Sequence, residues 1–351
     1  MDAMEYGRQL KVTEINRLLP MVRETIKARK KVIEIEKPYK ELCQEERTLK
    51  ESIQKAENFK ELVQRFDIPE KIFANGGKER IITMQKITSK DNEYIKHVRK
   101  LKDKKYRDNN NEYVIEGIKM IAEAIRENVN IKQIIICDDC EKTEAIPKEL
   151  MYEIAKQECV YVTNKIFESI TGVINPQGIL AVVAKQTQHD LKPSEQIDYT
   201  QDIIVALDDI QDPGNLGTIL RTVDSVGLNQ ILVSKGTADS YNPKVVRSTM
   251  GAIFRVRIIE CEDLKATLKE IKKHKFKIMV TSLQTENDIY NADFNKNVIV
   301  IGNEANGVKR DIQDMADNKV KIPMIGKTES LNASVATGIM LYEYVRRKIN
   351  E

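Results

Sequence analysis

The chain has 351 residues, 32% of them charged, and a formal net charge of +3 at pH 7. Its length exceeds that of most single domains, so we expect two or three domains with sizeable cores. No run of about eighteen apolar residues indicates a membrane span. The first five residues, Met1-Asp2-Ala3-Met4-Glu5, lack the apolar core of a secretory signal. We therefore expect a cytoplasmic protein with no membrane partner.

Residues 1–84 are typical of a charged helical extension. Apolar residues recur at helical spacing between Ile15 and Ile26, Pro38 predicts a break, and a second helical run extends from Tyr39 to about Phe66. Basic and acidic side chains are nearly balanced, which does not favour a nucleic-acid-binding tail. A pair of amphipathic helices or a short coiled coil is predicted, with a structural role or an RNA-contacting role both open.

Residues 85–190 predict a small α/β domain. Strand-like runs cover Glu112–Glu116, Ile131–Ile136, Cys159–Val162 and Ile179–Ala184. Helical segments such as Ile118–Glu127 and Lys148–Lys156 alternate with them. The polar residues 191–201, which include Pro193, are interpreted as a linker.

A basic window opens this α/β domain. Tyr94, His97 and Tyr106 are interleaved with seven cations, which are Lys96, Arg99, Lys100, Lys102, Lys104, Lys105 and Arg107. Phosphate neutralisation and base stacking both need such a mixture, so the window is a candidate RNA-binding surface. A solvated helix face is the alternative interpretation.

The five cysteines do not indicate a disulfide framework. Their number is odd and their spacing irregular, at Cys43, Cys137, Cys140, Cys159 and Cys261. Cys137 and Cys140 form one CxxC pair, but no second pair exists and the three histidines are scattered. Reduced thiols are predicted, and no metal is expected.

Residues 202–351 predict a mostly parallel sheet with helices on both faces. The strand-like runs are Ile203–Leu207, Gln230–Val233, Arg255–Ile259, Ile278–Thr281, Val298–Ile301 and Val320–Pro323. Helical spacers separate most of them, including a predicted helix over Leu216–Val226. The last segment, Asn332–Lys348, is predicted to form one long helix.

Three junctions in this region pass from an apolar strand into small and amide-bearing residues. They are Leu207–Gly217, Ile301–Val308, and Ile322–Met324 with the following Glu329–Ala336. Glycine, asparagine and serine at the point where a strand meets a helix indicate turns that hold a ligand. No GxGxxG and no P-loop occur, which argues against a conventional Rossmann-type methyltransferase.

These three segments resemble the signature motifs of the SpoU/TrmH family of RNA ribose 2'-O-methyltransferases, in the SPOUT superfamily. The resemblance covers roughly residues 85–351. It implies an α/β protein with a C-terminal SPOUT domain containing a trefoil knot, preceded by a small α/β RNA-binding domain. It also implies S-adenosyl-L-methionine as cofactor, ribosomal RNA of the large subunit as the favoured substrate, and a homodimer formed through the catalytic domains.

The resemblance also implies site residues. The expected cofactor-contacting residues are Thr281, Ser282, Leu283, Ile301, Gly302, Ile322, Met324, Leu331 and Ala333. Gly302 would let the backbone approach the ligand closely, and the apolar side chains would wall an adenine pocket. Plain core packing is the alternative for these apolar residues.

The expected catalytic residues are Arg221, Asn215, Glu304, Ser330 and Asn332. Arg221 matches the family's essential arginine, but a guanidinium does not readily lose its proton. We therefore expect Arg221 to clamp the target phosphate and stabilise the developing alkoxide. The others would position loops and substrate oxygens, and Ser330 and Asn332 could instead cap the last helix. Lys244 and Arg247 lie in a further family-like segment, Asn242–Ala252, and could contact phosphates or form a solvated helix face.

Three functions share these features. The favoured one is a 2'-O-methyltransferase for ribosomal RNA. A non-catalytic RNA-binding or ribosome assembly protein on the same scaffold is the alternative from another class. A methyltransferase that acts on transfer RNA, or one that confers antibiotic resistance, has the same chemistry and a different target.

Overall fold

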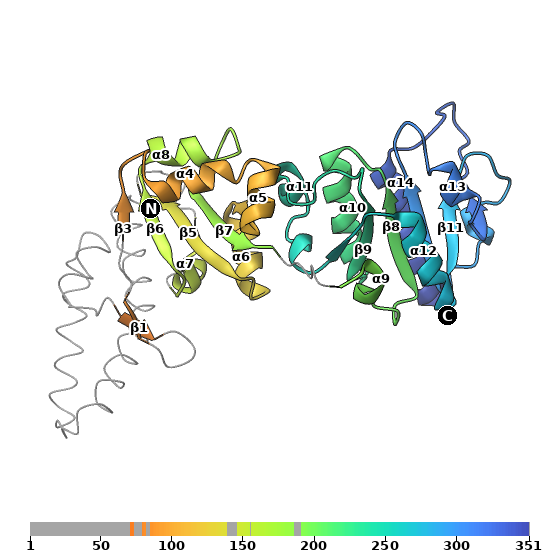
Figure 1. Cartoon of the computed structure of the whole chain (residues 1–351), viewed down its shortest axis with the longest axis horizontal. Coiled ribbons are helices and arrows are strands. Elements are labelled where there is room, and N and C mark those ends of the chain that lie inside the picture. The colour runs from red at the N-terminus through yellow and green to blue at the C-terminus, as the bar shows by residue number, and fades with distance from the viewer. Residues whose placement is uncertain are drawn as a thin grey trace, which may run out of the picture. The chain divides into compact units, whose positions relative to one another are not determined.

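The structure, a computed structural model, describes residues 71–73, 79–81, 85–138, 146–154, 156–185 and 191–350 (Figure 1). The chain divides into two compact units, residues 1–83 and 84–351. In the first unit, β1 (Lys71–Phe73) pairs antiparallel with β2 (Glu79–Ile81). The helices expected between residues 15 and 66 lie outside the described residues, as do Cys43 and Cys140.

A five-stranded mixed sheet forms the N-terminal part of the second unit. Its order is β3 (Gln85–Ile87), β6 (Cys159–Val162), β5 (Ile131–Cys137), β7 (Ile179–Ala184) and β4 (Glu112–Glu116). The first three strands run parallel, and β7 runs antiparallel to both β5 and β4. The four predicted strands are confirmed, while β3 is an additional edge strand of only three residues.

Helices cover both faces of this sheet. One face packs α6 (Ile118–Arg126) and α7 (Lys148–Ile154), and the other packs α4 (Glu93–Lys100) and α8 (Asn164–Ile170). The short helix α5 (Lys104–Asn110) leads into β4. The side chains of β7 alternate between the two cores, as expected for a strand buried on both faces.

A six-stranded sheet in which all strands are parallel forms the C-terminal part. Its order is β10 (Arg257–Cys261), β9 (Gln230–Ser234), β8 (Ile203–Asp208), β12 (Asn297–Gly302), β11 (Lys277–Thr281) and β13 (Asn318–Val320). Every neighbouring pair is parallel, which confirms the predicted sheet. The strand order reverses between β8 and β12, and ligands of such sheets bind beyond the carboxyl ends of the strands at this point.

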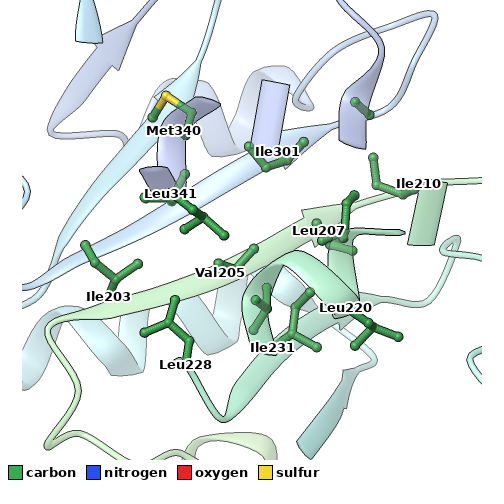
Figure 2. Close-up of a cluster of buried hydrophobic side chains, with 14 of the residues drawn as sticks. Ile203, Val205, Leu207, Ile210, Leu220, Leu228, Ile231, Ile301, Met340 and Leu341 are labelled. Carbon is green, nitrogen blue, oxygen red and sulfur yellow. The ribbon is translucent and has the colours of Figure 1, made fainter. Parts of the chain in front are cut away.

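Two helices, α10 (Pro213–Ser225) and α14 (Ala333–Asn350), cover one face of the parallel sheet. Figure 2 shows Val205 and Leu207 of β8 in the same cluster as Leu220 of α10 and Met340 of α14. The opposite face packs α12 (Leu264–Lys273) and α13 (Arg310–Gln313). None of the helices that the structure describes is long and apolar enough to cross a bilayer.

Three predicted boundaries are wrong by a few residues. Helix α10 begins at Pro213 instead of Leu216, because Asp212 caps it through a 2.8 Å hydrogen bond from the Asn215 backbone N–H. Strand β10 begins at Arg257 because the 3-10 turn η2 (Ala252–Phe254) precedes it. Strand β13 ends at Val320, so the following residues belong to a loop.

Residues 191–201, expected to form a linker, are folded against the parallel sheet. Pro193–Gln196 form the short helix α9, and Arg257 Nη1 donates to the Gln196 carbonyl at 2.6 Å. Ile197 is buried in the same cluster as α12. Tyr199 packs against the same cluster, and the polar composition of the segment concealed these two anchors.

The two sheets of residues 84–351 share a hydrophobic core. The segment after β9 contains α11 (Pro243–Ser248) and η2, and its Val246, Ile253 and Phe254 are buried in the same cluster as α6 and β5. Arg255 adds ion pairs at 2.7 Å to Glu123 of α6 and at 2.8 Å to Asp224 of α10. Residues 242–256 therefore form a structural joint between the two sheets.

Candidate active site

The three strand-end motifs meet at Asn215. Its side-chain Nδ2 donates to Glu304 Oε1 at 2.8 Å, and its Oδ1 accepts a 2.9 Å hydrogen bond from Asn332 Nδ2. Glu304 Oε2 also accepts a long 3.5 Å bond from the Gln211 backbone N–H. Because β8 and β12 are neighbours in the sheet, this network lies at the carboxyl edge where the strand order reverses.

Asn215 and Asn332 belong to the first turns of two helices. Asn215 is buried near the start of α10, so the glycine-rich turn expected around it is a helix N-terminus. Asn332 Oδ1 accepts hydrogen bonds from the backbone N–H groups of Ser334 at 2.9 Å and Val335 at 3.3 Å. Asn332 thus caps α14, as predicted, and also joins the network, while its catalytic role stays a prediction.

Gly302 ends β12 under a tight loop. A Cβ atom at this position would lie 2.1 Å from the Gly307 carbonyl carbon and the Val308 nitrogen. Asn303 and Gly307 close the loop with reciprocal backbone hydrogen bonds of 3.1 and 2.9 Å. The structure therefore gives a reason for the glycine that differs from the expected ligand approach: two backbone segments of the protein touch here.

Sequence reasoning missed an ionic cluster at the end of β8. Lys309 Nζ lies 2.8 Å from Asp209 Oδ2 and 3.3 Å from Asp208 Oδ1. Asp208 is buried, and its Oδ2 accepts the Lys309 backbone N–H at 2.7 Å, whereas Oδ1 has no hydrogen bond of good geometry. The Oδ1 contact is thus an ionic attraction. The sequence signal that could have predicted this cluster is the pair of acidic residues, Asp208 and Asp209, at the end of a buried strand.

Asp209 holds the turn after β8 in a left-handed conformation, with φ of 58°. Its carboxylate accepts a 2.8 Å hydrogen bond from Ser234 Oγ, and its carbonyl accepts one of 2.8 Å from Asn303 Nδ2. Partial burial acts to raise the pKa of Asp209, but the hydrogen bonds from Lys309 and Ser234 outweigh it and lower this pKa. The turn is therefore fixed by Ser234 at the end of β9, Asn303 directly after β12, and Lys309 before α13.

The expected cofactor residues divide into two groups. Ile301 and Ala333 are buried in the core beneath α10 and α14, and Ile322 packs partly against them. The remainder lie at strand ends and in loops. Gly302 is the buried last residue of β12, Thr281 is the last residue of β11, and Ser282, Leu283, Met324 and Leu331 lie in the loops after β11 and β13. The first group packs the core, and Leu283 and Leu331, which are 60% and 37% exposed, form an open apolar rim.

Ile325, which sequence reasoning did not select, is fully exposed within the same loop after β13. The backbone N–H groups of residues 324–331 form no hydrogen bond with another described residue. A loop that offers apolar side chains and free backbone donors can receive the adenosine part of S-adenosylmethionine.

Arg221 does not join the Asn215 network. The two residues are six positions apart in α10, which turns their side chains about 120° from each other around the helix axis. Arg221 is exposed and forms no hydrogen bond or ion pair with the described residues. Ser330 is also exposed and lies outside the network.

The face of α10 that carries Arg221 lies beside α14. Ser225, one turn after Arg221, has its Oγ 3.4 Å from the Tyr342 hydroxyl of α14. Arg221 therefore lies on the surface beside α14.

Arg107 is not part of an RNA-binding surface. It is buried, and its Nη1 donates to the Leu101 carbonyl at 2.7 Å and to the Lys102 carbonyl at 2.8 Å. Its Nη2 pairs with Asp239, in the segment that follows β9. The expectation for this residue is corrected: Arg107 fastens α5 to the segment that follows β9.

The other cations of the basic window are on the surface. Arg99 and Lys102 extend toward the end of α8, donating to Ser169 Oγ at 3.1 Å and to the Thr171 carbonyl at 3.0 Å. Four more lie on α4 and α5, where Lys96 pairs with Glu93, Lys104 pairs with Asp108, and Lys100 and Lys105 are exposed.

Lys244 and Arg247 lie one turn apart on α11. Lys244 Nζ is 3.5 Å from Asp212 Oδ2, the cap of α10, so it lies beside the Asn215 network. Arg247 is half-buried and forms no hydrogen bond or ion pair with the described residues. Both side chains are therefore placed between the basic window and the candidate site.

A cavity of about 370 Å³ lies at the opposite edge of the parallel sheet. Its lining includes Asp202 before β8, Leu228 before β9, and Lys348 near the end of α14. The strands begin there, whereas ligands of parallel sheets bind where the strands end. We therefore place the candidate site at the Asn215 network and not in this cavity.

The chain matches the SpoU rRNA Methylase family over residues 202–342 and an MRM3-like substrate binding domain over residues 92–181. It is 31% identical over 260 residues to the 23S rRNA (guanosine(2553)-2'-O)-methyltransferase RlmP of Bacillus subtilis, covering 74% of this chain and 98% of the relative. The chain belongs to the SpoU rRNA methylase family.

Solved structures agree with the assignment to the SpoU family. An AdoMet-bound rRNA methyltransferase from Sinorhizobium meliloti superimposes with a TM-score of 0.65 at 28% identity, over 75% of this chain and 98% of the other. An RNA 2'-O ribose methyltransferase superimposes with a TM-score of 0.64 at 28% identity, over 76% and 100%. The predicted SpoU enzyme, an RNA 2'-O-ribose methyltransferase that uses S-adenosyl-L-methionine, is confirmed.

Proposed function

We propose that the chain methylates a ribose 2'-hydroxyl in large-subunit ribosomal RNA. The supporting observation is the convergence of the three SpoU motifs on Asn215, next to a domain that matches a substrate-binding family. The substrate class is supported by the name of the Bacillus relative, which specifies 23S rRNA.

The cofactor is proposed to bind at the apolar rim. Leu283 and Leu331 would cover the adenine, the backbone donors of residues 324–331 would read its edge, and Thr281 and Ser282 would line the floor where β11 ends. S-adenosylmethionine, when bound, supplies an electrophilic methyl group for in-line transfer. The protein must then hold the ribose oxygen close and aligned.

Each polar residue of the site receives a role. Asn215, Glu304 and Asn332 hold the three loops in register through their hydrogen bonds. Arg221 is proposed to clamp the phosphate beside the target ribose and to stabilise the alkoxide that forms as the hydroxyl proton leaves. Ser330, exposed on the same rim, would contact the substrate.

A homodimer through α14 is also proposed. Val335, Tyr342 and Ile349 are 50%, 54% and 77% exposed, and their seven-residue spacing places them on one face of the helix. An apolar stripe of this kind suits a second copy of the same helix. Such a dimer would bury the face of α10 that carries Arg221, which accounts for a catalytic arginine outside the network of its own chain.

Two further expectations are part of the proposal. A trefoil knot in the C-terminal segment is supported by membership of the SpoU family. A cytoplasmic location suits an enzyme whose substrate is ribosomal RNA.

The decisive experiment maps 2'-O-methylated riboses in total RNA from cells with and without the gene. A single ribose of large-subunit ribosomal RNA should lose its methyl group when the gene is removed. Loss in transfer RNA instead would reject the substrate class. No lost methylation, together with no binding of S-adenosylhomocysteine by calorimetry, would favour the RNA-binding assembly protein.

A further inference from the structure

The loop Thr171–Gly178 between α8 and β7 carries an exposed isoleucine at its tip. Ile174 is 97% exposed, an unfavourable position for a large apolar side chain in water. The loop lies within the range matched by the substrate-binding family. Its sequence includes Pro176, which restricts the backbone near the tip.

Hydrogen bonds anchor this loop at both ends. Glu116 accepts the Thr171 hydroxyl and, at 3.0 Å, the Gly172 backbone N–H. Gln177 Oε1 accepts the backbone N–H of Ile118, at the start of α6, at 2.9 Å. The tip is therefore presented by a fixed frame, and the Glu116 carboxylate is engaged by the start of the loop.

Three cations from two parts of the chain lie beside the start of the loop. Arg247 Nη1 lies 3.1 Å from the position that a Cβ atom on Gly172 would take. Lys102 donates to the Thr171 carbonyl and Arg99 to Ser169. An exposed apolar tip with three cations at the start of its loop suits an unpaired nucleotide, with its base on the apolar group and its phosphate on a cation.

We propose that Ile174 and Arg247 form a docking point for one unpaired nucleotide of the RNA substrate. Ile174 packs against the nucleobase, and Arg247 pairs with the adjoining phosphate. This inference rests on the proposed function, because it concerns the same RNA. A-form duplex RNA offers no unstacked base to an apolar tip, so the docking point selects loops and bulges over stems.

The docking point is linked to the methylation site through α11. Arg247 is one helical turn from Lys244, and Lys244 Nζ lies 3.5 Å from Asp212, which caps the helix that carries Asn215. The shared core beneath α11 fixes this spacing. A nucleotide held at Ile174 would therefore set which ribose of the same RNA reaches the site.

The test uses the full chain and ribosomal RNA purified from cells that lack the gene. Methyl transfer from labelled S-adenosylmethionine gives KM and kcat, and filter binding gives Kd for the same RNA. Ile174→Ala should raise both KM and Kd about tenfold, with kcat within about twofold. Ile174→Phe should bind RNA about as tightly as the wild type, because the phenyl ring offers a stacking surface to the base. A merely structural role of Ile174 would not be filled in this way. Arg247→Ala should weaken binding and reduce its salt slope by about one phosphate contact.

Two matched substitutions control for nonspecific effects. Leu191→Ala removes an apolar side chain that is 46% exposed before α9, and Lys269→Ala removes an exposed cation on α12. Both should bind RNA like the wild type. A Kd for Ile174→Ala within twofold of that for Leu191→Ala would overturn the docking point. Failure of the wild type to methylate this RNA would instead reject the proposed function, and the ratio of Kd values would still decide on Ile174.

Discussion

Asn332 Nδ2 donates a hydrogen bond of 2.9 Å to Oδ1 of Asn215, although the two residues are 117 positions apart. Asn215 uses its other polar atom, Nδ2, to donate to Glu304 at 2.8 Å. One amide thus connects the ends of two strands and the start of the last helix. Only a side chain with a donor and an acceptor on one carbon can do this without changing either partner.

Asn215→Asp should destabilise the protein by about 1–3 kcal/mol at pH 7. The new carboxylate would lie against that of Glu304 and could no longer donate to it. Protonation of the introduced carboxyl group would relieve the repulsion, so the variant should regain part of its loss at pH 4. Urea unfolding at pH 7 and at pH 4 measures the loss of stability. Asn215→Ala should show no comparable recovery, and equal losses of Asn215→Asp at both pH values would contradict the network.

Gly302→Ala should abolish a correctly closed loop after β12. The added Cβ would meet backbone atoms of Gly307 and Val308 at 2.1 Å, and neither is a flexible side-chain end. We expect a loss of several kcal/mol in unfolding free energy, about 2–4 kcal/mol, and weaker binding of S-adenosylhomocysteine. Gly326→Ala is the matched control, because no atom lies within 4 Å of its added Cβ. Equal stability of the two variants would disprove the contact.

Arg221→Ala should reduce methyl transfer at least about a hundredfold, in line with the loss of a charge-stabilising group. The Kd for S-adenosylhomocysteine should stay within about twofold, since Arg221 lies outside the Asn215 network. Single-turnover kinetics and calorimetry separate the two effects. Arg310→Ala, which removes an exposed arginine on α13, should retain full activity. Wild-type turnover of Arg221→Ala would end the assignment.

Glu343 should make stability depend on pH in the acid range. Hydrogen bonds from Arg346 Nε at 2.7 Å and Arg347 Nε at 2.8 Å lower the pKa of this buried carboxyl to about 2. Because the folded pKa is below the unfolded value of 4.5, the stabilisation is complete above pH 4.5 and is lost as the pH falls toward 2.

The contribution of Glu343 is about 1–3 kcal/mol at neutral pH. Glu343→Gln should remove it, so the difference in unfolding free energy from the wild type should shrink as the pH falls from 5 to 3. Glu329→Gln, at an exposed position in the loop after β13, is the control. If the difference in unfolding free energy stays constant across this range, the contacts of Glu343 with Arg346 and Arg347 add no pH-dependent stability.

A truncated chain beginning at Met84 should fold and keep the thermal stability of the full-length protein within a few degrees. The compact unit begins at this residue, and β3 directly after it completes the five-stranded sheet. A chain beginning at Ser89 should melt lower, because it lacks the buried Ile87 of β3. Thermal unfolding followed by circular dichroism compares them. Failure of the Met84 chain to fold would show that residues 1–83 stabilise the remainder.

The sheet was predictable because its signal is local. Apolar runs such as Ile203–Leu207 indicate a strand buried on both faces, and the side chains of β8 do alternate between two cores. The three motifs were predictable as strand ends that meet. Helix starts were harder to predict. Because Asp212 caps α10, the helix begins three residues earlier in the chain than predicted, and Asn215 lies inside it.

Residues whose role depends on distant partners could not be assigned from the sequence. Arg107 stands in a basic window, yet its partner Asp239 lies beyond β9, and this contact decides its burial. Gly302 suggested a bound ligand, whereas its neighbour is the backbone of Gly307. Ile174 gave no signal at all, because an isolated apolar residue in a loop is ordinary until its exposure is known.

The position of Phe254 limits how this protein can be recombined. Its ring belongs to the part of the chain that matches the SpoU family, yet it is buried in the core of the part that matches the substrate-binding family. A chimera that exchanges recognition modules at a cut between residues 185 and 202 would leave Val246, Ile253 and Phe254 facing a foreign surface. New RNA targets are therefore easier to obtain by changing exposed loops than by exchanging a whole module. An exchanged module should include residues 242–256 of the donor protein.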